Sequence, residues 1–155
     1  MNYKDYVAKK QKEYDDLPIF YAFSNEQFKN AMEERGLTEQ DTDKVISLGI
    51  AGGFFLKKDR PIIDAYFQKK DVLPELMKDR DFAIEAFRYE MGNHEYFINW
   101  QADWDVCSCF GSCEYDESKT GGDYLREEGY PEEVVEWYYE ARAQEYKYWE
   151  DNDMF

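Results

Sequence analysis

In the segment DFAIEAFRYEMGNHE, residues 81–95, a helical pattern ends and a pattern typical of strands begins, so this segment is the most informative about the fold class. Apolar residues recur at helical spacing in its first part, so we expect a helix over residues 72–91, broken near Asp79 and stopped at Gly92. The aromatic and branched residues that follow predict two paired strands, over residues 94–100 and 104–110. The stretch therefore predicts helices and antiparallel strands within one chain.

The flanking sequence extends this pattern in both directions. Ser24 and Gln27 form a capping-box pattern, which predicts a helix that Gly36 closes. Further helices are expected over residues 3–14, 59–69 and 131–151, and strands over residues 19–23, 45–48 and 54–56. The glycine-rich segment 49–53 predicts a hairpin turn, since it lacks the lysine and hydroxyl of a phosphate-binding loop.

These elements do not alternate as strand, helix, strand, so the sequence predicts an α+β fold rather than a doubly wound sheet. We expect four or five helices packed on a small, mainly antiparallel sheet of about four short strands. The length of 155 residues fits a single acidic domain over residues 1–155. An aromatic share of 19% supplies the side chains for its core.

Three features of the sequence bear on the cellular compartment. The chain shows no secretory signal at its start and no apolar run long enough to cross a bilayer. Its three cysteines, an odd number, do not make a closed disulfide framework. We therefore expect a cytoplasmic protein.

Charge is the most informative property of the composition. The formal net charge is −16, and residues 114–155 alone hold 14 acidic against 4 basic residues. Such a field repels nucleic acid and anionic lipid and attracts basic protein surfaces. The alternative is that the charge serves solubility alone.

A polar cluster lies at the end of the expected central helix. Glu90 falls on the apolar stripe of that helix, and His94 and Glu95 follow it. A carboxylate held against an imidazole suits general acid–base catalysis or half of a metal site. The alternative is a buried hydrogen-bonded network that joins the helix to the next strand.

The cysteines have the spacing C-x-C-x₃-C at Cys107, Cys109 and Cys113. With His94 they could make a zinc site of three cysteines and one histidine. However, one residue between Cys107 and Cys109 is shorter than the usual ligand spacing, and two residues on one strand face suit packing equally well. No metal and no other cofactor is therefore assigned from the sequence.

The last expected helix is rich in both acidic and aromatic residues. Aromatic side chains ringed by charge resemble the anchors and polar rim of a protein interface. The alternative is an amphipathic helix that docks on the core and exposes an acidic back. The candidate partner-binding residues are Glu132, Glu133, Glu136, Trp137, Glu140, Trp149 and Glu150.

Several segments between Leu17 and Gly111 resemble a family of small uncharacterised proteins encoded by bacterial phages and other mobile elements. The resemblance rests on residues 17–28, 86–90, 98–106 and 108–111 and, most specifically, on Asn-His-Glu-Tyr at residues 93–96. It implies a genetic setting and no activity. Relatives commonly lack a cysteine at the position of Cys107, which weakens the zinc interpretation.

Charge and resemblance together give a leading hypothesis and two alternatives. The leading hypothesis is a non-enzymatic accessory protein in the host cytoplasm that binds a basic protein surface. That partner would be a nucleic-acid-binding defence protein, inhibited in the manner of an anti-CRISPR, anti-restriction or DNA-mimic protein. The alternatives are a hydrolase-like or metal-dependent enzyme that uses Glu90, His94 and Glu95, and a structural or regulatory phage accessory protein. The oligomeric state is left open.

Overall fold

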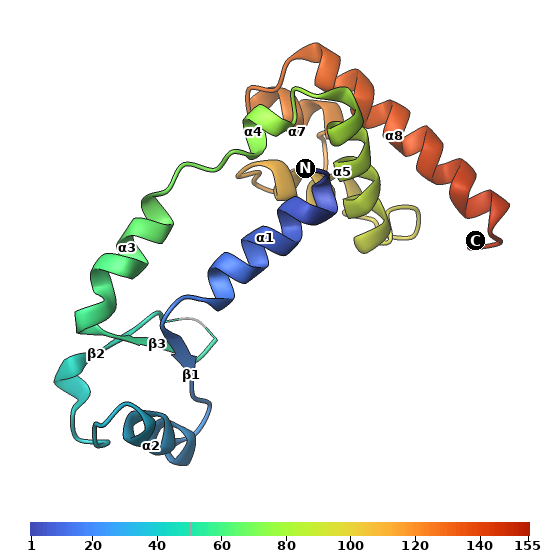
Figure 1. The fold of residues 1–155 in the computed structure, drawn as a ribbon. Coiled ribbons are helices and arrows are strands. Elements are labelled where there is room, and N and C mark those ends of the chain that lie inside the picture. The colour runs from blue at the N-terminus through green and yellow to red at the C-terminus, as the bar shows by residue number, and fades with distance from the viewer. Residues whose placement is uncertain (50) are drawn as a thin grey trace. The chain divides into compact units, whose positions relative to one another are not determined.

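The computed structural model describes residues 1–49 and 51–155 (Figure 1), and these divide into two compact units. We call Met1–Ala8 with Asp71–Phe155 the acidic unit, and Lys9–Lys70 the neutral unit. The neutral unit holds 11 acidic and 11 basic residues, whereas the acidic unit holds 24 acidic and 8 basic residues. The whole net charge of −16 thus belongs to one unit. The single domain over residues 1–155 stays a prediction.

The neutral unit is built on a three-stranded antiparallel sheet in the order β1-β3-β2. Its strands are β1 (Ile19–Tyr21), β2 (Val45–Ser47) and β3 (Gly53–Leu56), with Phe20 opposite Phe54 and Ile46 opposite Phe55. Helix α2 (Asn25–Glu34) contributes Met32 to a core with Phe20 and Leu56. The remaining elements are the second half of α1 (Tyr3–Asp15), the 3-10 turns Thr42–Lys44 and Lys57–Asp59, and α3 (Arg60–Gln68).

Local signals in this unit act as the sequence predicts. The Ser24 hydroxyl accepts a hydrogen bond from the Gln27 N–H at 3.1 Å, which caps the start of α2. Gly36 has a φ of +72°, the left-handed conformation that ends a helix. Strands β2 and β3 form the expected hairpin, in which the predicted turn at residues 49–53 includes Ile50, outside the described residues.

The acidic unit is helical in the part of the chain that the structure describes. It contains the start of α1, α4 (Leu73–Leu76), α5 (Arg80–Asn93), α6 (Ala102–Cys107), α7 (Gly121–Glu127) and α8 (Glu132–Asp151), with a 3-10 turn at Ser108–Phe110. Helices α5 and α8 pack along each other, as Figure 1 shows. Their shared core includes Phe87, Met91, Leu125, Tyr138 and Ala141, all fully buried.

The α+β class is therefore confirmed, but the numbers of elements are corrected. The described residues form three strands rather than four, and more helices than four or five. The predicted strands over residues 94–100 and 104–110 are wrong, because these residues form turns, helix α6 and a 3-10 turn. The buried residues Ala102, Val106 and Phe110 recur every four positions, which is a helical period rather than the alternation of a strand.

Helix α5 has the predicted break at its start but ends later than predicted. Asp79 caps it, accepting the Phe82 N–H at 2.9 Å. Its end is a Schellman motif, in which the Tyr96 N–H donates to the Met91 carbonyl at 2.9 Å and the Glu95 N–H to the Gly92 carbonyl at 3.3 Å. Glu95, with a φ of +49°, takes the left-handed position that the sequence assigns to Gly92.

None of the helices formed by residues 1–49 and 51–155 combines the length and apolar character that a bilayer crossing needs.

Gly121 is a position where the core allows no side chain. A Cβ there would collide with the ring of Tyr138, which is fully buried. We expect Gly121→Ala to lower the free energy of unfolding by about 2 kcal/mol, as overpacked cores do. Chemical denaturation of the purified chain measures this change.

Gly92→Ala is the matched control in the same unit. It lies inside α5, and its Cβ would meet only the Glu145 Oε1 atom at an ordinary 3.7 Å. We expect it to be neutral or to add up to about 1 kcal/mol of stability. Equal effects of the two substitutions would contradict the packing described for Tyr138.

Candidate functional site

Glu90 is a carboxylate buried on the core side of α5. It follows Phe82, Ala83 and Phe87 on the buried face of the helix, and only 6% of the residue is exposed. A carboxylate in such a place is costly unless other groups donate hydrogen bonds to it. The inward direction is the one that the apolar stripe of the sequence predicts.

Three donors surround the Glu90 carboxylate, and they come from different segments. The Tyr3 hydroxyl donates to Oε1 at 2.8 Å, and Asn93 Nδ2 lies 3.4 Å from Oε2. The Cys109 thiol donates to Oε2 at 3.2 Å. The N-terminal helix, α5 and the 3-10 turn after α6 are therefore joined through one side chain.

His94 stands beside this carboxylate at the C-terminal cap of α5. Its Nε2 atom lies 3.4 Å from Glu90 Oε2 and 3.5 Å from Cys109 Sγ, and 31% of its side chain is exposed. Among the described residues, Glu90, His94 and Cys109 form a group whose potential ligand atoms all lie within 4.8 Å of one another. We call these three residues the Glu90 cluster.

The structure thus brings together two of the three residues of the predicted enzyme site. Glu95 is exposed and serves the turn that ends α5, whereas Cys109 takes a place next to Glu90 and His94. The zinc hypothesis grouped Cys109 with the other cysteines on their spacing in the sequence, and the predicted strand over residues 104–110 placed Cys107 and Cys109 on one face. A helix predicted over the same residues would have placed Cys107 and Cys109 on different faces.

The other two cysteines have different surroundings. The buried Cys107 thiol lies 3.6 Å from the Gly121 carbonyl, and the Cys113 thiol lies 3.9 Å from Glu128 Oε1. The four residues proposed from the sequence as zinc ligands, His94, Cys107, Cys109 and Cys113, therefore face three separate environments.

Burial and the charge of Glu90 raise the pKa of Cys109 to about 12. Burial likewise raises the pKa values of Cys107 and Cys113 above their usual range. Thiols with such pKa values are protonated at neutral pH, whereas the thiolate is the nucleophile. In this state of the protein, nucleophilic catalysis by cysteine is not favoured.

The candidate partner surface on α8 is only partly accessible. Trp137 and Trp149 are both buried, and Trp149 packs edge-on against Phe97 with ring centres 5.4 Å apart. Glu132 pairs with Arg126 at 2.6 Å, and Glu140 pairs with Arg80. The exposed carboxylates of the predicted set are Glu132, Glu133, Glu136 and Glu150.

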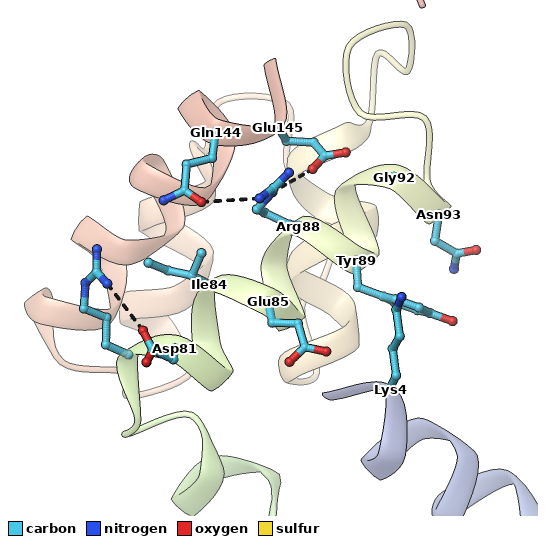
Figure 2. A pocket seen from close by; sticks show the side chains of 11 residues that line it. Lys4, Asp81, Ile84, Glu85, Arg88, Tyr89, Gly92, Asn93, Gln144 and Glu145 are labelled. Carbon is cyan, nitrogen blue, oxygen red and sulfur yellow. Dashed lines mark hydrogen bonds and ion pairs between the residues drawn. The ribbon is translucent and has the colours of Figure 1, made fainter. Parts of the chain in front are cut away.

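A pocket between α5 and α8 contains the second buried carboxylate of the unit. Figure 2 shows Arg88 of α5 reaching Gln144 and Glu145 of α8. Arg88 Nε donates to Glu145 Oε2 at 2.9 Å, and Glu145 is almost fully buried. This ion pair fixes the two helices against each other, which is a structural role.

A group of exposed apolar side chains follows the Glu90 cluster along the chain. Trp100 is 81% exposed and Ile98 is 69% exposed, and Tyr115 meets the Trp100 ring edge-on at 5.9 Å. We call Trp100 and Tyr115 the Trp100 patch. Neither residue stands out as an anchor in the sequence, because their exposure depends on how the turns after α5 are folded.

A polar pocket adjoins the Trp100 patch. Trp100 and Tyr115 belong to its lining, together with Asp103, Asp116 and Glu117. Apolar rings thus stand beside carboxylates at the surface of the acidic unit.

Comparison with known proteins gives one family. Residues 2–117 match the model of a family described as a family of unknown function (DUF7659). The matched segment includes the Glu90 cluster and the Trp100 patch, and it ends before α7 and α8. No curated protein and no solved structure matches the chain.

The Arg88–Glu145 pair can be tested by removing its cation. We expect Arg88→Met to lower the free energy of unfolding by about 2 kcal/mol, because the buried Glu145 carboxylate would lose its partner. The loss should be smaller than for a fully buried pair, because Arg88 is partly exposed and water can reach it. Replacing both residues, as Arg88→Met with Glu145→Met, should recover much of this loss. Chemical denaturation gives the three values.

Arg60→Met provides the comparison, since Arg60 pairs with Asp64 at an exposed site on α3. That change should stay within about 0.5 kcal/mol. A loss for Arg88→Met no larger than that for Arg60→Met would refute a structural role for the buried pair.

Proposed function

The chain belongs to this family of unknown function, and we propose that it is a non-enzymatic binding protein whose acidic unit docks on a basic protein surface. The observation that carries the proposal is the position of an exposed tryptophan, Trp100, among carboxylates on the unit that holds the entire net charge. Charge would guide the encounter, and the aromatic rings would supply the contact.

The charge distribution supports a directed surface rather than general solubility. Solubility is served by charge anywhere on the chain, but residues 9–70 carry none of the excess. A field concentrated on one unit accelerates association with basic surfaces and repels nucleic acid and anionic membranes. The expected partner is therefore a protein with a basic face, and neither a nucleic acid nor a membrane.

The Trp100 patch has the composition of an interface anchor. Tryptophan and tyrosine are enriched among the residues that dominate binding energy, and arginine is their frequent counterpart. An arginine of the partner could stack on the Trp100 or Tyr115 ring and pair with Glu117 at the same time. This arrangement replaces Trp137 and Trp149 as anchors, because both are buried.

Hydrogen bonds hold this region in place before any partner binds. Asn99 Nδ2 donates to the His94 carbonyl at 3.1 Å and to Asp105 Oδ2 at 2.6 Å. Trp104 Nε1 donates to the Cys113 carbonyl at 2.8 Å, and the Trp104 ring contacts Tyr115. A preorganised surface loses less conformational entropy on binding.

The narrower proposal concerns the identity of the partner. Proteins that cut or bind nucleic acid carry basic grooves, so an acidic surface can occupy such a groove in place of the nucleic acid. Together with the phage resemblance, this makes inhibition of a nucleic-acid-targeting defence protein in the host cytoplasm the preferred role. A structural or regulatory role for a phage is the alternative, and deletion of the gene on hosts with and without defence systems separates the two.

The enzyme alternative has weaker support. Glu90 and His94 are close enough for proton transfer, at 3.4 Å, but Glu95 points to solvent from the turn after α5. The Glu90 carboxylate already accepts hydrogen bonds from Tyr3 and Cys109, which fits a structural network.

Affinity capture from a bacterial lysate tests the proposal. We expect the immobilised chain to retain basic, nucleic-acid-binding proteins at about 0.1 M salt and to release them toward about 1 M, as the Debye length falls from about 10 Å to 3 Å. Glu117→Lys should weaken capture several-fold, whereas Glu39→Lys, an exposed site on the neutral unit with the same charge change, should not. Mass spectrometry identifies and quantifies the captured proteins.

The aromatic contribution is measured on the captured partner with a second matched pair. Trp100→Ser should weaken binding by about 2 kcal/mol, roughly 30-fold in Kd. Phe67→Ser, at a 61% exposed aromatic residue of the neutral unit, should leave Kd unchanged. The proposal fails if no basic protein is enriched at low salt, or if the members of both pairs behave alike.

A further inference from the structure

The three potential ligand atoms of the Glu90 cluster form a triangle of a particular size. Its sides are 3.2 Å from Cys109 Sγ to Glu90 Oε2, 3.5 Å from Cys109 Sγ to His94 Nε2, and 3.4 Å from His94 Nε2 to Glu90 Oε2. A tetrahedral zinc ion, with Zn–S near 2.3 Å and Zn–N and Zn–O near 2.1 Å, holds its ligand atoms about 3.4 to 3.6 Å apart. The side chains therefore already stand at nearly the separations that such an ion imposes.

We propose that Glu90 Oε2, His94 Nε2 and Cys109 Sγ bind a Zn²⁺ ion, with water as the fourth ligand. One sulfur, one imidazole nitrogen and one carboxylate oxygen are donors that zinc accepts, and three protein ligands leave one position open. This set differs from the one considered in the sequence, since Glu90 replaces Cys107 and Cys113.

The surrounding hydrogen bonds orient the carboxylate for this task. Tyr3 holds Oε1 at 2.8 Å, so Oε2 is the oxygen that faces the thiol and the imidazole. Partners of this kind fix the orientation of metal-binding carboxylates and tune their affinity. Tyr3 is thus a positioning residue, and its hydroxyl keeps its proton when the ion binds.

Charge and access are both consistent with a divalent cation. On binding, the Cys109 S–H bond breaks, an S–Zn bond forms and the proton passes to water, while the hydrated ion keeps one water as its fourth ligand and releases the others. The resulting thiolate and the Glu90 carboxylate balance the two positive charges of the ion. His94, with 31% of its side chain exposed, lies on the side from which the ion can enter.

The site would join segments that are distant in sequence. Glu90 and His94 stand one turn apart at the end of α5, whereas Cys109 lies in the 3-10 turn Ser108–Phe110. An ion held by all three would fasten this turn to α5, next to the segment that carries Trp100.

Cobalt binding to the full-length, tag-free chain tests the proposal. We expect one Co²⁺ per chain, with the thiolate-to-cobalt absorption band in the near ultraviolet and visible bands of a tetrahedral ion, all removed by competition with Zn²⁺. Cys109→Ser should abolish the charge-transfer band and lower affinity at least 10-fold. Cys113→Ser, which removes a cysteine outside the cluster, should retain both.

Two further variants test the metal site independently of Cys109→Ser. His94→Ala changes a partly exposed side chain, so it replaces Cys109→Ser if circular dichroism shows that the serine variant is unfolded. Tyr3→Phe should retain the band and weaken binding about 10-fold to 100-fold, as loss of an orienting hydrogen bond does. The proposal is overturned if the wild-type chain shows no stoichiometric Co²⁺ binding, if the band survives in a folded Cys109→Ser variant, or if His94→Ala binds Co²⁺ as tightly as the wild-type chain.

Discussion

Helix α5 holds the acidic unit together because it carries one of the unit's two buried carboxylates and the arginine that pairs with the other. It carries Glu90, whose oxygens accept hydrogen bonds from Tyr3 and Cys109, and it carries Arg88, which pairs with Glu145 of α8. A buried carboxylate without such partners would cost several kcal/mol. The packing of α1, α8 and the turn after α6 against α5 therefore depends on where these polar groups meet.

This constraint also determines what the unit shows to solvent. With 24 acidic residues and 8 basic ones, the unit needs a large aromatic core to offset the repulsion among its charges. Trp137 and Trp149 are buried in that core, although the glutamates around them in the sequence resemble the rim of an interface. Trp100 lies outside it and is exposed, so burial rather than local sequence context separates the core tryptophans from the one that we propose as an anchor.

Several features could be predicted from the sequence because they depend on neighbouring residues alone. The Ser24 cap, the break at Asp79 and the inward direction of Glu90 are of this kind. The strands predicted over residues 94–110 were wrong because short aromatic runs suit both strands and buried helices, and tertiary contacts decide between them. The 102, 106, 110 period was visible in the sequence and favours the helix.

The candidate sites were less predictable because they join residues that are distant in sequence. The contact of Cys109 with Glu90 spans 19 positions, and that of Tyr3 with Glu90 spans 87. The burial of Trp149 depends on Phe97 and Phe155, and the exposure of Trp100 depends on the turn that Asn99 holds in place. No local pattern records such contacts.

We propose that Trp100 on the acidic unit receives the basic partner, and the indole N–H signals of the four tryptophans give a direct test. The measurement is a ¹⁵N–¹H spectrum of the full chain during titration with a deca-arginine peptide at low salt. We expect the Trp100 signal to change most, while those of the buried Trp137 and Trp149 stay in place. An unchanged Trp100 indole signal, with the largest changes among the backbone amide signals of residues 9–70, would contradict this proposal.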